Sequence, residues 1–259
     1  MKLSIWQVDA FTSRVLAGNP AAVVPLEAWL DDALMLAIAA ENNLSETAFF
    51  VRESAGWRIR WFTPALEVEL CGHATLASAH VLLRHLEPSL ESVTFASRSG
   101  SLAVTRQGEM LAMDLPAYPS RRIDTPPLLV EAIGADPAET WLGVKMMALF
   151  ESEAQVRSLA PDFAKVARIE AFGVIATAPG ESSDCASRYF VPQAGVPEDP
   201  VTGAAHCQLV PYWAQRLGRT NVHARQVSKR GGELWCEHRG ARVTLAGHAV
   251  DYLRGTIEV

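Results

Sequence analysis

The second half of the chain repeats the order of several short motifs that occur in the first half. A shift of about 127 residues superposes an apolar run, a Phe-x-Pro motif and, after a gap of a few residues, a presumed helix start. The three pairs are Glu46–Val51 with Gly173–Ala178, Phe62–Pro64 with Phe190–Pro192, and Cys71–Ala79 with Asp199–Cys207. Because their order and spacing agree, we predict a duplicated fold with a small-molecule site at the seam between the copies.

Short strand patterns dominate the first half and do not alternate strictly with helices. Apolar runs with period two or without interruption predict strands at 3–11, 21–24, 47–52, 57–62, 92–96, 102–106 and 109–114. Helical spacing of apolar residues predicts helices over 28–42 and 74–84. This order favours an α+β fold over a doubly wound sheet.

A proline-rich segment at 117–127 interrupts these patterns. Proline lacks a backbone donor and disfavours both helices and central strands, so we predict that this segment is a linker. It divides the chain into an N-terminal half, residues 1–116, and a C-terminal half, residues 128–259. We leave open that the last strand pairs back with the N-terminal half.

Each half contains a strand, a polar turn with a glycine, and the start of an apolar helix. The first N–H groups of a helix lack intrahelical partners and carry partial positive charge, so two such starts suit a small anion. Glycine also lets the backbone approach a ligand closely. The predicted substrate-binding residues are therefore Gly72, Ala74, Thr202, Gly203, Ala204, Gly231 and Gly232. For the last two, a hairpin turn is the alternative.

Three residues are candidates for acid/base chemistry. Glu46 stands at the mouth of an apolar strand, where burial tunes a carboxyl group for proton transfer at neutral pH; a solvated strand-end glutamate is the alternative. His73, at a presumed helix start, would bind a carboxylate or relay a proton, unless it is a capping or buried structural histidine. Asp199 precedes Pro200 and fits a helix cap, a catalytic group, or both.

Cys71 supports a different mechanism. A thiol at a helix N-terminus has a lowered pKa and acts as an acid or base. Racemases that need no cofactor use two such thiols, one on each face of the substrate carbon. The second half has no thiol at the equivalent place, and Cys207 lies several residues into the helix. We therefore retain Cys71 only as an auxiliary thiol.

Composition excludes several other classes of function. A net charge of -6 with only short basic clusters argues against a nucleic-acid partner. The sequence has no apolar run long enough for a membrane span and no signal peptide pattern, so we predict a cytoplasmic protein without a membrane partner. Four scattered cysteines predict neither disulfides nor a zinc site. No nucleotide motif is present, and we predict no cofactor.

Taken together, the motifs resemble the PhzF-like isomerase family of phenazine biosynthesis over nearly the whole chain. The resemblance rests on Val8–Thr12, Ala17–Val24, Leu44–Phe49, Phe62–Pro64, Cys71–Thr75, Glu198–Gly203 and Arg230–Leu234. It implies a fold similar to diaminopimelate epimerase, with two pseudo-symmetric halves, each a barrel-like mixed sheet around a central helix. It also implies a homodimer, no cofactor, and isomerisation of a small anionic metabolite by proton shuttling.

Within this resemblance, Glu46 matches the proton-transferring glutamate, and His73 and Asp199 match residues that assist it and hold the substrate. Two departures, Ala204 in place of a substrate-binding serine and the thiol of Cys71, argue against the phenazine precursor as substrate. We therefore expect a cofactor-independent isomerase of a small carboxylate. A cysteine-dependent amino-acid racemase or epimerase and a non-catalytic binding protein are the alternatives.

Overall fold

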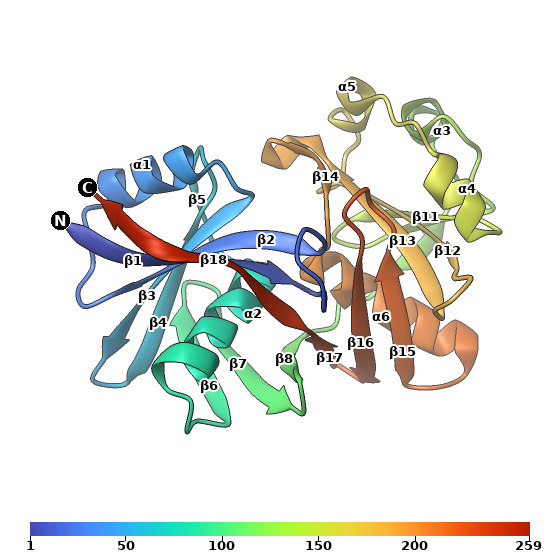
Figure 1. Cartoon of the computed structure of the whole chain (residues 1–259). Coiled ribbons are helices and arrows are strands. Elements are labelled where there is room, and N and C mark those ends of the chain that lie inside the picture. Colours follow the sequence, from blue (N-terminus) through green and yellow to red (C-terminus); the bar gives the residue numbers. More distant parts are fainter. The chain divides into compact units, whose positions relative to one another are not determined.

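The computed structural model describes all residues from Met1 to Val259, and Figure 1 shows their elements. The chain forms two compact units. Unit 1 contains Met1–Asp114 and Ala246–Val259, and unit 2 contains Leu115–Leu245. Both units combine a mixed sheet with a few helices, which confirms the predicted α+β class.

Unit 1 is built mainly from the first eight strands and the last one. Its strands are β1 (Lys2–Ala10), β2 (Asn19–Leu26), β3 (Glu46–Glu53), β4 (Gly56–Phe62), β5 (Glu67–Val68), β6 (Ser92–Ser97), β7 (Gly100–Gln107), β8 (Met110–Pro116) and β18 (Ala249–Glu258). Its helical segments are α1 (Asp32–Asn42), α2 (Gly72–Val81) and the π-helical turn η1 (Leu82–Leu86). The seven strands and the first two helices predicted for this half are therefore present.

Unit 2 contains the remaining strands and most of the short helices. Its strands are β9 (Arg121–Ile123), β10 (Glu139–Leu142), β11 (Met146–Leu149), β12 (Val174–Pro179), β13 (Cys185–Val191), β14 (Val196–Asp199), β15 (Asn221–Gln226), β16 (Gly232–Arg239) and β17 (Arg242–Gly247). Its helical segments are α3 (Pro127–Ile133), α4 (Glu153–Ser158), α5 (Phe163–Val166), the 3-10 turn η2 (Pro192–Ala194) and α6 (Gly203–Leu217).

The strands of the two units pair in the same order and sense. In unit 1, β2 and β3 are parallel, β3 and β4 antiparallel, β4 and β5 antiparallel, β4 and β6 parallel, and β6 and β7 antiparallel. In unit 2 the same sequence of pairings joins β11, β12, β13, β14, β15 and β16. Shared strand order and sense confirm the internal duplication predicted from the motifs.

One long buried helix occupies the same place in the order of each unit. Every residue of α2 from His73 to Val81 is buried, and α6 buries ten of its fifteen residues. Burial on nearly every side means that the polar side chains of such a helix need partners inside the unit. Two α2 hydroxyls that would otherwise be unpaired, those of Thr75 and Ser78, donate to the carbonyls of Cys71 and Ala74.

The chain termini meet in unit 1. Strand β18 pairs antiparallel with β1 along its length, from Lys2 opposite Glu258 to Ala10 opposite Ala249, and Figure 1 shows the two ends of the chain side by side. The register shifts between Gln7 and Val8, so that Tyr252 is an extra residue on β18. Such a bulge redirects the neighbouring side chains of the strand.

The segment predicted as a linker, 117–127, has regular structure of its own. Residues Arg121–Ile123 form β9, which pairs antiparallel with Thr140–Leu142 of β10. The prolines on both sides do not prevent this pairing, because a three-residue strand needs few backbone donors and none of its residues is proline. Separately, none of the helices combines the length and the apolar composition required to cross a lipid bilayer.

Burial of His206 in α6 makes the stability of the fold dependent on pH. Its Nδ1 lies 2.8 Å from the Thr202 carbonyl, and burial lowers the pKa of His206 to about 4. An unfolded histidine takes up a proton below a pH of about 6.5. This contribution to stability is therefore complete above that pH and is lost as the pH falls towards 4, by about 1.4 kcal/mol per pH unit.

We expect His206→Gln to remove this part of the pH dependence. Denaturant unfolding between pH 4 and 7 would show a shallower loss of stability in the variant than in the wild type. His238→Gln is the matched control, because His238 Nε2 contacts only the Gly240 carbonyl at an exposed turn. Parallel profiles for the wild type and His206→Gln would contradict the prediction.

Candidate functional site in each unit

Glu46 and His73 form the centre of the site in unit 1. His73 Nε2 lies 3.1 Å from Glu46 Oε2, and the side chains are 5% and 18% exposed. Neither atom makes a hydrogen bond of normal geometry, although both are buried. Glu46 is thus not in bulk solvent, and this close but poorly aligned pair can still accept or donate a proton to a third group.

Local structure explains why these two residues meet. Glu46 is the first residue of β3, and His73 is the second residue of α2. Strand β3 contacts α2, and it runs parallel to β2, with Glu46 opposite Ala21. The carboxylate and the imidazole therefore lie where one strand and the buried helix both begin.

Asn19, the first residue of β2, contacts the opposite nitrogen of the imidazole. Its Nδ2 lies 3.1 Å from His73 Nδ1, and both groups are buried. When the ring is neutral and the amide is the donor, Nδ1 accepts and the ring proton resides on Nε2, which is the nitrogen that faces Glu46. Asn19 therefore orients the ring of His73 and selects its tautomer.

Cys71 also contacts the ring nitrogen that faces Asn19, with its Sγ 3.5 Å from His73 Nδ1. Burial raises the pKa of the Cys71 thiol to about 11, and Glu46 adds to this effect. The lowered thiol pKa expected at a helix start is therefore wrong for this residue, because the loss of water around the sulfur outweighs the helix start and His73.

The surroundings of His73 shift its pKa in opposite directions. Burial alone lowers the pKa of His73, whereas Cys71 and Glu46, when ionised, raise it well above its ordinary value. Since Cys71 is an uncharged thiol at neutral pH, Glu46 is the group that favours the imidazolium there.

The start of α2 lies directly beside this pair. Cys71 is the N-cap, and no side chain caps the helix. Gly72 is partly exposed, while Ala74 is buried. The N–H groups of this first turn have no intrahelical partner and suit an anionic group of a substrate. The donor atoms of Glu46, Cys71 and His73 lie within 4.8 Å of one another, a spacing that would also suit a metal ion.

In unit 2, Asp199 belongs to a network around the start of α6. Thr202, the N-cap residue, donates its hydroxyl to Asp199 Oδ2. Gln226 accepts from the Thr202 N–H at 2.9 Å and donates to the Asp199 carbonyl at 2.7 Å. Thr202 thus takes the N-cap position that the sequence allowed for Asp199, and Asp199 closes strand β14.

The other predicted binding residues of unit 2 lie in two turns. Gly203 and Ala204 open α6, where Ala204 is partly exposed. Gly231 has a φ of +67° and precedes the first residue of β16, Gly232, so the pair closes the β15–β16 hairpin. Ser228 anchors this hairpin by accepting from the Gly231 N–H and donating to the Pro200 carbonyl.

Three residues of these networks, Asn19, Gln226 and Ser228, were not predicted from the sequence as site residues. Asn19 lies within the Ala17–Val24 motif, but a single amide carries no periodicity that would indicate its contact with His73. Gln226 ends strand β15, 24 residues after Thr202. For Asn19 and Gln226, the only sequence pattern that would have identified the residue is its position as a polar residue at one end of an apolar strand.

Comparison with known proteins places the chain in a family. The model of the phenazine biosynthesis-like protein family, PhzC-PhzF, matches residues 8–255. An uncharacterized isomerase of Pseudomonas aeruginosa is 54% identical over 262 residues, covering 100% of both chains. The crystal structure of a PhzF-family phenazine biosynthesis protein from Enterococcus faecalis is 44% identical, with a TM-score of 0.98 over 100% of both chains.

A more distant structure supports the fold alone. A hydroxyproline epimerase from Agrobacterium vitis has a TM-score of 0.65 at 10% identity, covering 99% of this chain and 92% of its own. The match of the family model over most of the chain and the high identity of the relatives agree with the motif resemblance. The chain therefore belongs to the phenazine biosynthesis-like protein family and is an enzyme of the isomerase class.

Proposed function

We propose that this isomerase moves a proton on a small carboxylate-bearing metabolite, without a cofactor, and that Glu46 is its acid/base group. The observation that supports the proposal most strongly is the contact between Glu46 Oε2 and His73 Nε2, 3.1 Å apart. Both atoms are buried and lack a well-aligned partner. Such atoms remain available to a substrate, whereas a purely structural ion pair would satisfy them.

In the proposed mechanism, Glu46 removes a proton from an activated carbon and returns it to another carbon of the same molecule. His73, held by Asn19 at 3.1 Å, steadies the negative charge that develops, since its Nε2 carries the proton. The uncapped N–H groups at the start of α2 bind the substrate carboxylate. Preorganised donors of this type usually supply the largest share of the rate enhancement.

The roles predicted for unit 2 stay predictions. Asp199 is proposed to hold the ring or amino group of the substrate, and the α6 start and the Gly231–Gly232 turn are proposed to bind it. Ala204 offers no hydroxyl at the position of the family serine, which argues for a substrate other than the phenazine precursor. The predicted homodimer and cytoplasmic location also remain proposals.

The thiol mechanism is disfavoured by the surroundings of both candidate cysteines. Cys71 is 6% exposed and Cys207 is 2% exposed, and burial raises the pKa of their thiols to about 11 and about 12. Each is therefore protonated and weakly reactive at neutral pH. The carboxylate of Glu46 is therefore a better candidate for the acid/base group than either thiol.

We expect Cys71→Ser to retain proton exchange. The test is incubation of the enzyme with a set of small amino and cyclic carboxylic acids in D2O, followed by mass spectrometry for incorporated deuterium. The wild type and Cys71→Ser should label the same acid at rates within about tenfold, because loss of a general acid or base costs about 100-fold or more. Complete loss in Cys71→Ser would favour the racemase mechanism, and a bound acid without any labelling by the wild type would favour a non-catalytic protein.

A further inference from the structure

A second group of convergent side chains lies in unit 1, away from the Glu46–His73 pair. His80 Nε2 is 3.0 Å from Asp251 Oδ1, and His85 Nε2 is 2.8 Å from Asp251 Oδ2. One donor atom from each residue lies within 4.8 Å of the other two. From this geometry we infer that His80, His85 and Asp251 form a binding site for a divalent transition-metal ion such as Zn2+.

The backbone brings the two histidines together by an unusual turn. On an α-helix, residues five apart point about 140° away from each other. Here α2 continues into the π-helical turn η1, which the Glu87 N–H closes by donating to the Leu82 carbonyl at 2.7 Å. A π-turn brings residues five apart onto nearly the same face, and such turns occur frequently at functional sites.

A second irregularity places the carboxylate. Asp251 lies opposite Val8 on β18, next to the bulge at Tyr252. The bulge interrupts the regular alternation of side chains beside Asp251, and the carboxylate of Asp251 reaches His80 of α2. Two deviations from regular structure, one in a helix and one in a strand, therefore converge on the same three side chains.

The ring of His85 is also held in place. The His85 ring stacks on the Trp6 ring, with the ring centroids 6.0 Å apart. The guanidinium of Arg254 lies over the same Trp6 ring, 5.3 Å from its centroid. His80 is buried, at 8% side-chain exposure. Rotamers that are fixed before binding reduce the entropy lost when an ion is coordinated.

The donors match the chemistry of zinc. Zn2+ accepts imidazole nitrogen and carboxylate oxygen at about 2.0–2.2 Å, and three protein ligands with an open position are common. Without the ion, the Nε2–H groups of the two rings donate to the carboxylate. With the ion bound, each neutral ring carries its proton on Nδ1 and offers Nε2 as a lone pair, so that coordination requires no oxidation or covalent step.

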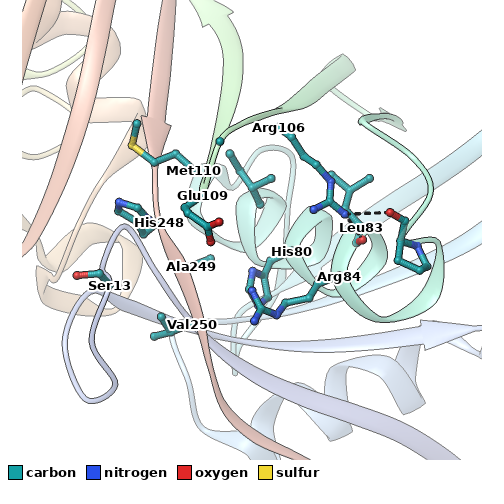
Figure 2. Close-up of a pocket in the computed structure, with 13 residues that line it drawn as sticks. Ser13, His80, Leu83, Arg84, Arg106, Glu109, Met110, His248, Ala249 and Val250 are labelled. Carbon is teal, nitrogen blue, oxygen red and sulfur yellow. Dashed lines mark hydrogen bonds between the residues drawn. The ribbon is translucent and has the colours of Figure 1, made fainter.

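A cavity adjoins one of the three proposed ligands, His80. A cavity of about 740 Å³ in unit 1 is lined by His80 together with Ser13, Arg84, Glu109 and His248, among others. Figure 2 shows His80 and Arg84 at this cavity, with Val250 of β18 nearby. Water from the cavity can supply the remaining ligand. The bound ion would fasten the C-terminal strand to the end of the helix whose start carries His73.

Calorimetric titration of the EDTA-treated full-length protein with Zn2+ tests this site. We expect one ion per chain and a higher Tm in its presence, because an ion that binds only the folded state stabilises it. His85→Gln should weaken binding by roughly 100-fold or more, since even loss of an outer-shell partner costs roughly 10–100-fold. Asp251→Asn keeps the shape of the side chain and should lose both the binding and the Tm increase.

Two controls separate this site from other binding. Cys71→Ser should bind Zn2+ like the wild type, because the Glu46–Cys71–His73 group is not involved. Co2+ used as a spectroscopic probe should show no thiolate charge-transfer band. Absence of a saturable site, equal affinity of the wild type and His85→Gln, or loss of binding in Cys71→Ser would each overturn the inference. None of these outcomes depends on proton exchange, so the proposed function stands or falls separately.

Discussion

Glu46→Gln is expected to lower deuterium incorporation by about 100-fold to 10,000-fold, the usual contribution of a positioned acid or base. Glutamine has nearly the same shape as glutamate and can occupy the same place 3.1 Å from His73. It cannot remove a proton from carbon. The loss should therefore appear in the rate of exchange, while binding of the labelled acid changes little.

The matched control for this variant is Glu53→Gln. Glu53 ends the strand that Glu46 begins, and its carboxylate makes only surface contacts, with Trp29 at 3.4 Å and Arg58 at 4.0 Å. The Glu53→Gln variant should therefore incorporate deuterium at the wild-type rate. Exchange by Glu46→Gln at the wild-type rate, measured with the same acid that the wild type labels, would remove Glu46 from the mechanism.

The duplicated fold could be predicted because its evidence is local and ordered. Strands such as β3 and β4 are short apolar runs, and each buried helix begins with a glycine. Two copies of the same order support each other, and the strand pairings agree with that order. The strand β9 was not predicted because three residues between prolines carry no period, and its pairing with β10 depends on tertiary structure.

The candidate site was predictable only in part, because some of its contacts join residues far apart in the sequence. Glu46 and His73 stand out because each is a polar residue where an apolar element begins, and the structure brings them together. Asn19 and Gln226 act through amide hydrogen bonds to residues 54 and 24 positions away in the sequence, which no local pattern encodes. The pKa of Cys71 was mispredicted because burial, which depends on the whole unit, outweighs the local effect of the helix start.

Gly18→Ala is expected to destabilise unit 1 by about 3 kcal/mol or more, at the upper end of the usual cost of a single substitution. Gly18 has a φ of +63°, and a Cβ there would lie 2.3 Å from the Ala10 carbonyl oxygen and 2.6 Å from Thr12 Cγ2. The carbonyl belongs to the backbone of β1 and has no flexible end that could move aside. Strand β2 would therefore have to shift at its first residue, Asn19, which orients His73.

Gly108→Ala separates the steric conflict from the cost of the backbone conformation. Gly108 has a φ of +62°, and nothing lies within 4 Å of a Cβ placed there. Gly108→Ala should lower the free energy of unfolding only by the cost of placing alanine in the left-handed region, about 1–2 kcal/mol. Denaturant unfolding of both variants, with deuterium exchange measured on the folded fraction, distinguishes the two effects. Equal destabilisation would mean that β2 yields to the added methyl group, and normal exchange by folded Gly18→Ala would mean that His73 does not depend on the position of Asn19.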